Sequence, residues 1–289
     1  MSKRILVTGS SGFVGKNLYL RLGKESFVTG ISRNDLYFTD DVVDIRDRER
    51  LHSVLDDRNP KVVIHCAYNL HVDGCEVNPL EAAITNIEGT NNVVDWCKER
   101  SRKLVFMSTD YVYSLNGNVV NDEKSPVGSL NVYTSHKIEN EQYIRKNLKD
   151  YLIIRSGFIY GYDKKGLNFL MQMINSEGNM KVPEDQIISP TNVDYLTESI
   201  EGLLNGDFVG IYNCNGNESL SRFDFANKIS DVLKLKFRPT PILTKDIENK
   251  APRPLSCVVD SSLIQIATGI IPLSNNSYLK QIEETLTYY

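Results

Sequence analysis

Three glycines near the start of the chain restrict its fold more than any other feature. They are Gly9, Gly12 and Gly15, and they lie between an apolar run at residues 4–8 and an apolar-faced helix expected over residues 16–22. In such a strand–turn–helix unit, the first glycine permits a tight turn, the second lets backbone approach a pyrophosphate, and the third allows close helix–strand packing. The N–H groups at the start of the helix attract phosphate. We therefore expect dinucleotide contacts from Gly9, Ser11, Gly12, Phe13, Val14 and Gly15, the alternative being a plain strand-to-helix turn.

The rest of the first half alternates between strands and helices. Apolar runs predict strands at residues 27–31, 42–43, 61–67, 103–107 and 151–155, and helices at 47–58, at 79–99 and from Tyr133 onward. The run at 61–67 is nearly continuous, which is typical of a parallel strand buried on both faces. In the helix at 79–99 the inward-facing residues are expected to be Ala83, Ile87, Val94 and Trp96. This alternation predicts an α/β fold with a Rossmann-type doubly wound parallel sheet.

The pattern loosens after residue 162. Helices are expected around Phe169 and at about 194–205, 221–234 and 277–286, with a strand at 210–214. We expect these pieces to return to the sheet rather than to form an independent domain. The predicted division is an NAD(P)-binding Rossmann domain at 1–161 plus about 187–214, and a smaller, interleaved substrate-binding lobe at about 162–186 and 215–289.

The ends of three predicted strands carry residues suited to a dinucleotide. Arg33 follows the second strand, where an acid usually binds the ribose of NAD and an arginine suits the 2′-phosphate of NADP. NADP(H) is therefore favoured over NAD(H), which stays an alternative, and a solvated surface arginine would leave the same sequence. Asp44 and Ile45, after the third strand, are placed to hold the adenine ring. At the edge where ligands bind in open α/β sheets, the fourth strand ends in Cys66, Ala67 and Tyr68.

A tyrosine and a lysine four residues apart form the second candidate for chemistry. Tyr133 and Lys137 would lie on one face of a helix. A phenol with a pKa near 10 is a poor proton donor at neutral pH, and a nearby ammonium lowers that pKa. Thr109, at the end of a buried strand, would bring a hydroxyl to the same place. This set suits carbonyl reduction or alcohol oxidation, although the pair by itself also occurs in helices without a catalytic role.

Composition and charge limit the partners. A net charge of −4 argues against a nucleic-acid or anionic-membrane surface. No apolar run is long enough to span a bilayer and no signal peptide is evident, so we expect a cytoplasmic protein and leave a homodimer open. The five cysteines form no C-x-x-C pair, which favours buried thiols over disulfides or zinc. We expect no metal site, because the four histidines are not spaced along the chain as metal ligands are; they are His52, His65, His71 and His136.

Several stretches match the motifs of a known family. Residues 108–113 match S-T-D-Y-V-F, residues 185–191 match D-Q-x-x-x-P-T, and residues 72–76 match V-D-x-x-E. Residues 253–256 are similar to the start of R-P-x-x-S, and residues 126–137 to P-x-N-x-Y-G-x-x-K. With the glycine turn and Tyr133-x-x-x-Lys137 in this order, the chain resembles the extended short-chain dehydrogenase/reductases, and within them the dTDP-4-dehydrorhamnose reductases. The resemblance covers nearly the whole chain.

This resemblance implies NADPH-dependent reduction of the 4-keto group of a nucleotide-linked 4-keto-6-deoxyhexose, a step of deoxysugar nucleotide biosynthesis. It implies that Tyr133 donates a proton to the ketone oxygen and that Thr109 binds the same oxygen. It implies that Lys137 binds the nicotinamide ribose and lowers the pKa of Tyr133. The implied substrate contacts are Val72, Asp110, Tyr111, Gln186 and Arg253.

The chain departs from that family at two places, which leaves the sugar, the base and the direction of reaction open. Residues 67–70 read A-Y-N-L where the family has A-A-Y-T, and Pro252 stands where a second arginine is usual. One alternative is a nucleotide-sugar epimerase of the same fold. Another is a non-catalytic, NADP-binding regulatory subunit resembling that of methionine adenosyltransferase. Dehydration is disfavoured, because Tyr111 stands where dehydratases of the superfamily have an acid.

Overall fold

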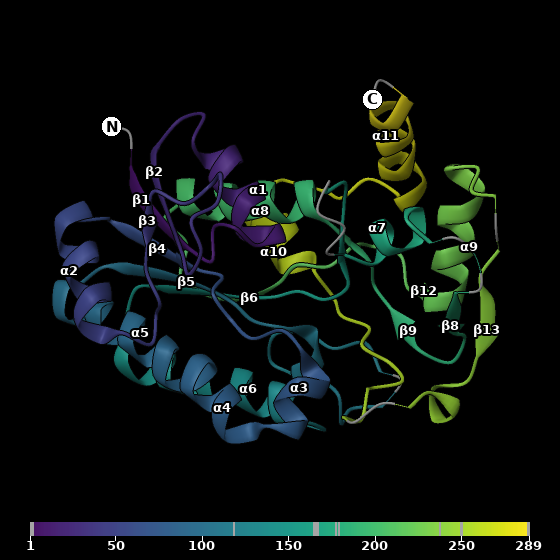
Figure 1. The fold of residues 1–289 in the computed structure, drawn as a ribbon, viewed down its shortest axis with the longest axis horizontal. Helices are drawn as coiled ribbons and strands as arrows, with labels where there is room; N and C mark the ends of the chain where they lie inside the picture. Colours follow the sequence, from purple (N-terminus) through teal and green to yellow (C-terminus); the bar gives the residue numbers. More distant parts are fainter. Residues whose placement is uncertain are drawn as a thin grey trace.

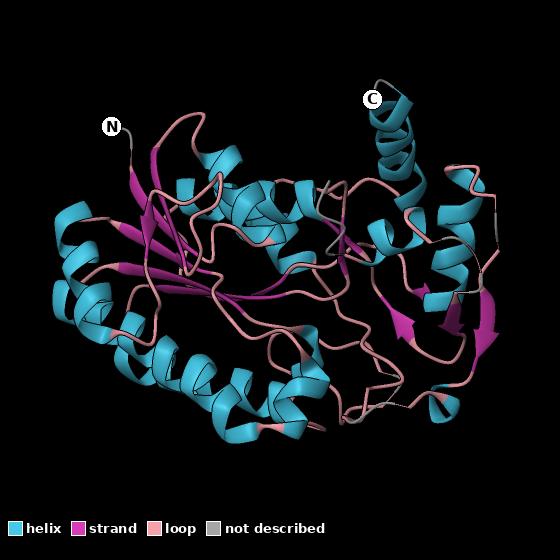
Figure 2. Ribbon diagram, in the orientation of Figure 1, coloured by secondary structure: helices cyan, strands magenta, loops and turns pink. Residues whose placement is uncertain are grey.

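The computed structural model describes residues 3–117, 119–163, 168–176, 178, 180–236, 238–248 and 251–287. Its centre is a seven-stranded sheet in which every neighbouring pair of strands is parallel (Figures 1 and 2). The strand order is β11-β6-β5-β4-β1-β2-β3. The strands are β1 (Arg4–Thr8), β2 (Phe27–Ser32), β3 (Asp41–Val42), β4 (Val62–His65), β5 (Lys103–Met107), β6 (Tyr151–Arg155) and β11 (Gly210–Asn213). This confirms the predicted doubly wound α/β fold.

Helices cover both faces of the sheet (Figure 1). Along β1, Ile5 and Val7 are buried in one apolar cluster while Leu6 is buried in another, as the two-residue period of a strand requires. The first cluster includes side chains of α1 (Phe13–Leu22), α8 (Val193–Asn205) and α10 (Ser262–Thr268). The second includes side chains of α2 (Arg48–Arg58), α5 (Gly89–Arg100) and α6 (Val132–Asn147). Because both faces are covered, the central strands have to be apolar throughout.

The helix predicted at 79–99 is interrupted by a wider turn. The segment consists of α4 (Pro79–Ala83), a π-helical turn η1 (Ile84–Glu88) and α5, and it is preceded by α3 (Val72–Val77), which was not predicted. Val94 and Trp96 are buried as expected, but the fully buried residues before and within the π turn are Ala82 and Asn86 rather than Ala83 and Ile87. A π turn contains an extra residue, which shifts the buried face by one position. The prediction for Ala83 and Ile87 was therefore wrong.

The C-terminal half adds a smaller lobe and one more strand of the sheet. Three pairs of short strands occur among the described residues: β7 (Ile159–Tyr160) with β10 (Thr191–Asn192), β8 (Lys181–Pro183) with β13 (Thr240–Ile242), and β9 (Ile187–Ile188) with β12 (Leu220–Ser221). The helices here are α7 (Phe169–Ile174), α9 (Arg222–Val232) and α11 (Asn275–Thr287), and there are 3₁₀ turns η2 (Asp110–Val112) and η3 (Thr244–Asp246). Strands of two or three residues are too short to show a period, so the sequence did not reveal them.

The chain returns to the sheet after this lobe has begun. Strand β11 pairs with β6 at the edge of the sheet, and α8 and α10 pack against the same face as α1. Of the helices in the described part of the chain, none has the length and apolar character needed to cross a bilayer.

Candidate active site

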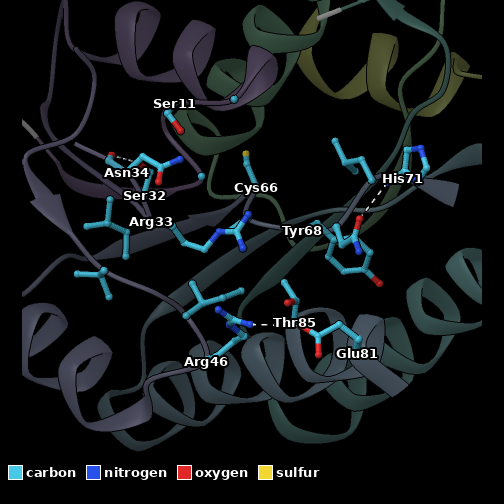
Figure 3. A pocket seen from close by; sticks show the side chains of 18 residues that line it. Ser11, Ser32, Arg33, Asn34, Arg46, Cys66, Tyr68, His71, Glu81 and Thr85 are labelled. Carbon is cyan, nitrogen blue, oxygen red and sulfur yellow. Dashed lines mark hydrogen bonds and ion pairs between the residues drawn. The ribbon is translucent and has the colours of Figure 1, made fainter. Parts of the chain in front are cut away.

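The carboxyl ends of the central strands border a cavity of about 510 Å³, which we call the glycine-turn cavity (Figure 3). It lies where β1 is flanked by β2 on one side and by β4 on the other, the switch point at which doubly wound sheets bind ligands. Eight of the predicted cofactor residues line it: Gly9, Ser11, Gly12, Arg33, Ile45, Cys66, Ala67 and Tyr68.

The glycine turn brings backbone rather than side chains to this cavity. Gly9 has φ +66°, and a Cβ at this position would lie 2.7 Å from the backbone nitrogen of Ala67. A Cβ on Gly15 would lie 2.2 Å from the carbonyl oxygen of Gly9, so Gly15 allows α1 to approach the turn closely. The N-cap of α1 is Gly12, and no side chain caps the helix start. The first N–H groups of α1 are therefore available to an anion, next to the positive end of the helix dipole.

Two arginines lie at the other end of the glycine-turn cavity. Arg33 extends into the cavity, and Arg46 lies below it in Figure 3. Arg46 forms ion pairs with Asp44 (2.6 Å) and with Glu81 (3.6 Å). The hydrogen bond from Arg46 is the main reason that the pKa of Asp44 is lowered, and the charge of Arg33 lowers it further. Asp44, predicted to contact the adenine, is thus bound by Arg46 and does not line the cavity, whereas Arg46 does.

A second cavity, of about 250 Å³, contains the predicted catalytic residues, and we call it the Tyr133 cavity. Thr109 follows β5, and Tyr133 and Lys137 lie on α6. The predicted residues that line it are Val14, Cys66, Tyr68, Val72, Thr109, Asp110, Tyr111, Tyr133 and Lys137. Because Cys66 and Tyr68 line both cavities, the two adjoin, and a ligand in the glycine-turn cavity can extend to Tyr133.

Lys137 is held tightly although it is almost fully buried. Lys137 is only 2% exposed to solvent, and its Nζ donates a hydrogen bond to the carbonyl oxygen of Met107 (2.6 Å). The same Nζ lies 3.4 Å from the ring centroid of Tyr68, a cation–π contact. Burial lowers the pKa of Lys137 to about 7. The positively charged form of Lys137 is therefore energetically unfavourable at this position.

The pKa of Tyr133 is shifted in the direction opposite to our expectation. Burial raises the pKa of the phenol, and the nearby Thr109 hydroxyl lowers it by a smaller amount. The Nζ of Lys137 lies 5.9 Å from the ring centroid of Tyr133, against 3.4 Å from that of Tyr68. The expected lowering of this pKa by the ammonium was thus wrong for this structure, because desolvation of the phenolate outweighs an ammonium directed at another ring.

Buried networks fix the elements that carry these side chains. The start of α6 is capped by Asn131, whose side chain accepts a hydrogen bond from the backbone of Thr134 (2.9 Å). One turn after Lys137, Glu141 accepts hydrogen bonds from Ser108 (2.6 Å) and from Arg155 (3.0 and 2.5 Å). This carboxylate ties α6 to β6 and to the end of β5, directly before Thr109.

Five predicted site residues line neither cavity: Phe13, Gly15, Asp44, Gln186 and Arg253. Gln186 is buried and accepts a hydrogen bond from Arg222 (2.9 Å), and Arg253 forms an ion pair with Asp73 (3.1 Å). Cavity residues that the sequence reasoning missed include Arg46 and Thr85 in the first cavity and Ser156 and Phe158 in the second. Only Arg46 carried a local signal, since it lies two residues after Asp44 at a predicted strand end.

Lys137 makes the stability of the folded chain depend on pH. In the unfolded chain its pKa is near 10, so between about pH 7 and pH 10 the unfolded state binds more protons and stability rises with pH. Below pH 7 both states are protonated, and the cost of burying the charge is fully present. We expect a Lys137→Met variant to exceed wild type in stability at pH 7, with a difference that shrinks toward pH 10. Urea unfolding of both proteins across this range measures it, and a constant difference would contradict the expectation.

Comparisons with known proteins agree with this geometry. A family model described as "RmlD substrate binding domain" matches residues 3–288. The dTDP-4-dehydrorhamnose reductase of Aggregatibacter actinomycetemcomitans is 28% identical over 294 residues, which cover 96% of this chain and 98% of the relative. Methionine adenosyltransferase 2 subunit beta of Mus musculus is 24% identical over 279 residues, which cover 91% and 82%.

A solved structure resembles the fold over its whole length. It is the dTDP-4-dehydrorhamnose reductase of Bacillus anthracis in complex with NADP, with a TM-score of 0.88, 28% identity, and coverage of 99% of this chain and 100% of that one. Because the family model extends over almost all of the chain, including the glycine turn and the Tyr133 cavity, this protein belongs to the RmlD substrate binding domain family.

Proposed function

We propose that this protein uses NADPH to reduce the 4-keto group of a nucleotide-linked 4-keto-6-deoxyhexose. The observation that carries the proposal is the meeting of Thr109, Tyr133 and Lys137 in one cavity that adjoins the glycine-turn cavity. Relatives that span nearly the whole chain are dTDP-4-dehydrorhamnose reductases, and one of them has been solved with NADP. The protein is thus an oxidoreductase that acts on a sugar ketone.

In the proposed reaction, Tyr133 donates its phenolic proton to the ketone oxygen as C4 becomes an alcohol carbon. A phenol that burial keeps protonated has its proton in place before the reaction begins. Thr109 binds the same oxygen and holds the carbonyl in position. Lys137, with its Nζ fixed by Met107 and Tyr68, orders the side of the cavity that the nicotinamide ribose would contact.

The residues of the glycine-turn cavity fit a dinucleotide. Gly9 and Gly12 leave room for a pyrophosphate against backbone, and the uncapped start of α1 offers N–H donors. Cys66 and Tyr68 border both cavities, where a nicotinamide would pass from one to the other. When bound, NADPH supplies the hydride that C4 of the sugar accepts.

Arg33 and Arg46 make the site selective for the phosphorylated cofactor in this proposal. A 2′-phosphate would meet two guanidinium groups, of which Arg33 extends into the cavity and Arg46 is held in place by Asp44. We expect Arg33→Ala to raise the KM for NADPH about 10- to 100-fold while the KM for NADH stays unchanged. Initial rates with each cofactor measure this ratio. A loss of equal size with both cofactors would show that Arg33 does not bind the 2′-phosphate.

The substrate would lie between the sheet and the smaller lobe. We propose that Val72, Asp110 and Tyr111 contact the sugar, since they line the Tyr133 cavity, and that Gln186 and Arg253 lie farther out toward the nucleotide. In this division the dinucleotide binds to residues 1–161 with about 187–214, and the substrate to the lobe at about 162–186 and 215–289.

A panel of nucleotide-linked 4-keto sugars tests the proposal. Each sugar is incubated with NADPH or NADH, oxidation of the cofactor is followed by absorbance, and the C4 configuration of the product is read by NMR. We expect stoichiometric NADPH oxidation with at least one 4-keto-6-deoxyhexose. A C4 epimer formed without net oxidation of NADPH would instead identify an epimerase.

The mouse relative suggests the second candidate, a regulatory subunit without catalysis. Such a subunit has no need for Thr109, Tyr133 and Lys137 in one buried cavity, and the complete set favours the enzyme. A stoichiometric protein partner, together with no turnover on any sugar in the panel, would decide for the regulatory function.

A further inference from the structure

Arg222 occupies a place in the smaller lobe where a positive charge is poorly compensated. It is the first residue of α9, its Nη1 donates to the side-chain oxygen of Gln186 (2.9 Å), and its backbone N–H donates to the carbonyl oxygen of Gln186 (2.9 Å). Its Nε is buried and has no hydrogen-bond partner. In the described part of the chain no carboxylate forms an ion pair with the partly buried Arg222, although charged groups withdrawn from water are usually paired.

Three physical effects disfavour a cation here. The start of a helix carries the positive end of its dipole, so an arginine at this position of α9 is repelled. Burial removes water from the guanidinium, and the charge of Arg253 adds to the repulsion; both lower the pKa of Arg222. Gln186 provides only a neutral oxygen. A residue that costs stability in this way is typical of a binding site, where the ligand supplies the missing charge.

Arg222 lies next to two aromatic side chains, one of which lines the Tyr133 cavity. Its guanidinium carbon lies 5.2 Å from the ring centroid of Phe158 and 5.5 Å from that of Phe169. Phe158 lines the Tyr133 cavity and has φ +44°, a left-handed conformation that a bulky residue rarely adopts. Tyr111, which lines the same cavity, lies close enough to Arg222 and Arg253 that both charges lower the pKa of its phenol, although burial raises that pKa to about 12 overall.

We propose that Arg222 binds the diphosphate of the nucleotide-sugar substrate, together with Arg253, and so determines specificity for a diphosphate-linked sugar. Neither guanidinium group lines the Tyr133 cavity, but both lie close to Tyr111, which does. A substrate anion bound by them would leave its sugar beside Tyr111 and Tyr133. The free Nε–H and the fork of Arg222 suit a phosphate oxygen, and Arg253, already held by Asp73, supplies the second charge. The inference rests on the proposed function for the identity of the sugar, but not for the anion site.

Binding of dTDP to the full-length protein tests this inference. We expect Arg222→Met to weaken dTDP about 10- to 100-fold in calorimetric titrations, because it removes charge-assisted hydrogen bonds. Thymidine, which lacks phosphates, should bind both proteins equally. In steady-state assays the KM for the nucleotide-sugar should rise much more than kcat falls, since the contact is present before and during the reaction. NADPH affinity should be unchanged.

Thermal stability separates this function from a structural one. Because Arg222 is poorly compensated, Arg222→Met should melt at the same temperature as wild type or above it without ligand. Inorganic pyrophosphate should raise the melting temperature of wild type and have less effect on the variant. The matched control is Lys228→Met on the same helix, which loses a partly exposed ion pair with Glu218 (2.6 Å) and should keep wild-type dTDP affinity.

Two results would overturn the inference. One is an Arg222→Met protein that binds dTDP as tightly as wild type. The other is a variant that is strongly destabilised or fails to fold while pyrophosphate has no effect on the melting of wild type, since Arg222 would then be structural. If wild type binds dTDP through Arg222 but reduces none of the 4-keto sugars, the anion site stands and only the proposed reaction fails.

Discussion

Replacing Tyr133 by Phe is expected to lower kcat for reduction of the nucleotide-linked ketone by a factor of about 10²–10⁴. The variant keeps the ring that packs against Tyr68, with centroids 5.9 Å apart, and loses only the hydroxyl. Without that hydroxyl no acidic proton is aligned with the ketone oxygen, and the alkoxide that forms has to take its proton from water. The dissociation constant of NADPH, measured by fluorescence titration, should be unchanged because the glycine-turn cavity is intact.

The matched control is Tyr143→Phe on the same helix. The Tyr143 hydroxyl donates a hydrogen bond to Asp95 (2.8 Å), away from both cavities, so this variant should keep the wild-type kcat. A Tyr133→Phe protein that oxidises NADPH at nearly the wild-type rate would remove Tyr133 from the mechanism. The proposal would then have to assign the proton to another group of the cavity.

The second large effect concerns stability. We expect Arg155→Met to reduce the free energy of unfolding by about 3–5 kcal/mol, since it leaves the Glu141 carboxylate buried without its cation. Both side chains are almost completely buried, and Arg155 donates two hydrogen bonds to Glu141. Ser108 and the Tyr113 hydroxyl belong to the same network, so its loss also loosens the strand end that carries Thr109. Urea unfolding, with the midpoint and the slope fitted together, measures the change.

Two further variants show whether burial is the cause. Arg48→Met breaks an exposed ion pair with Asp95 (2.6 Å) and should cost about 0–1 kcal/mol. The double variant Arg155→Met with Glu141→Leu removes both buried charges and should recover much of the lost stability. An Arg155→Met cost no larger than that of Arg48→Met would mean that solvent reaches Glu141 and that the network does not support the site.

The site contains buried cations that oppose folding. Lys137 is buried with a lowered pKa, and Arg222 lies at a helix start beside Arg253. A surrounding of low polarity strengthens every electrostatic contact with a bound ligand. We therefore expect variants that neutralise Lys137 or Arg222 to gain or keep stability as they lose function, while Arg155→Met loses both.

The parts of the fold and the site that depend on local pattern could be predicted from the amino-acid order. The doubly wound sheet followed from apolar runs alternating with helices, and the turn at Gly9 followed from a backbone shape that only glycine adopts easily. The spacing of Tyr133 and Lys137 placed both on one face of α6, where they share a cavity. These features depend on residues that are close together in the sequence, so the sequence is enough to predict them.

Features that depend on distant contacts and on burial could not be predicted in this way and became visible only in the folded chain. The direction of the pKa shift of Tyr133 and the position of Arg222 beside Phe158 both arise from segments that are far apart in the chain. The π turn at Ile84–Glu88 shifts the buried face of the helix by one residue, and the spacing of apolar residues does not predict such a turn. Desolvation and pairing of charges depend on all the groups that pack around a side chain, and these groups come together only when the chain folds.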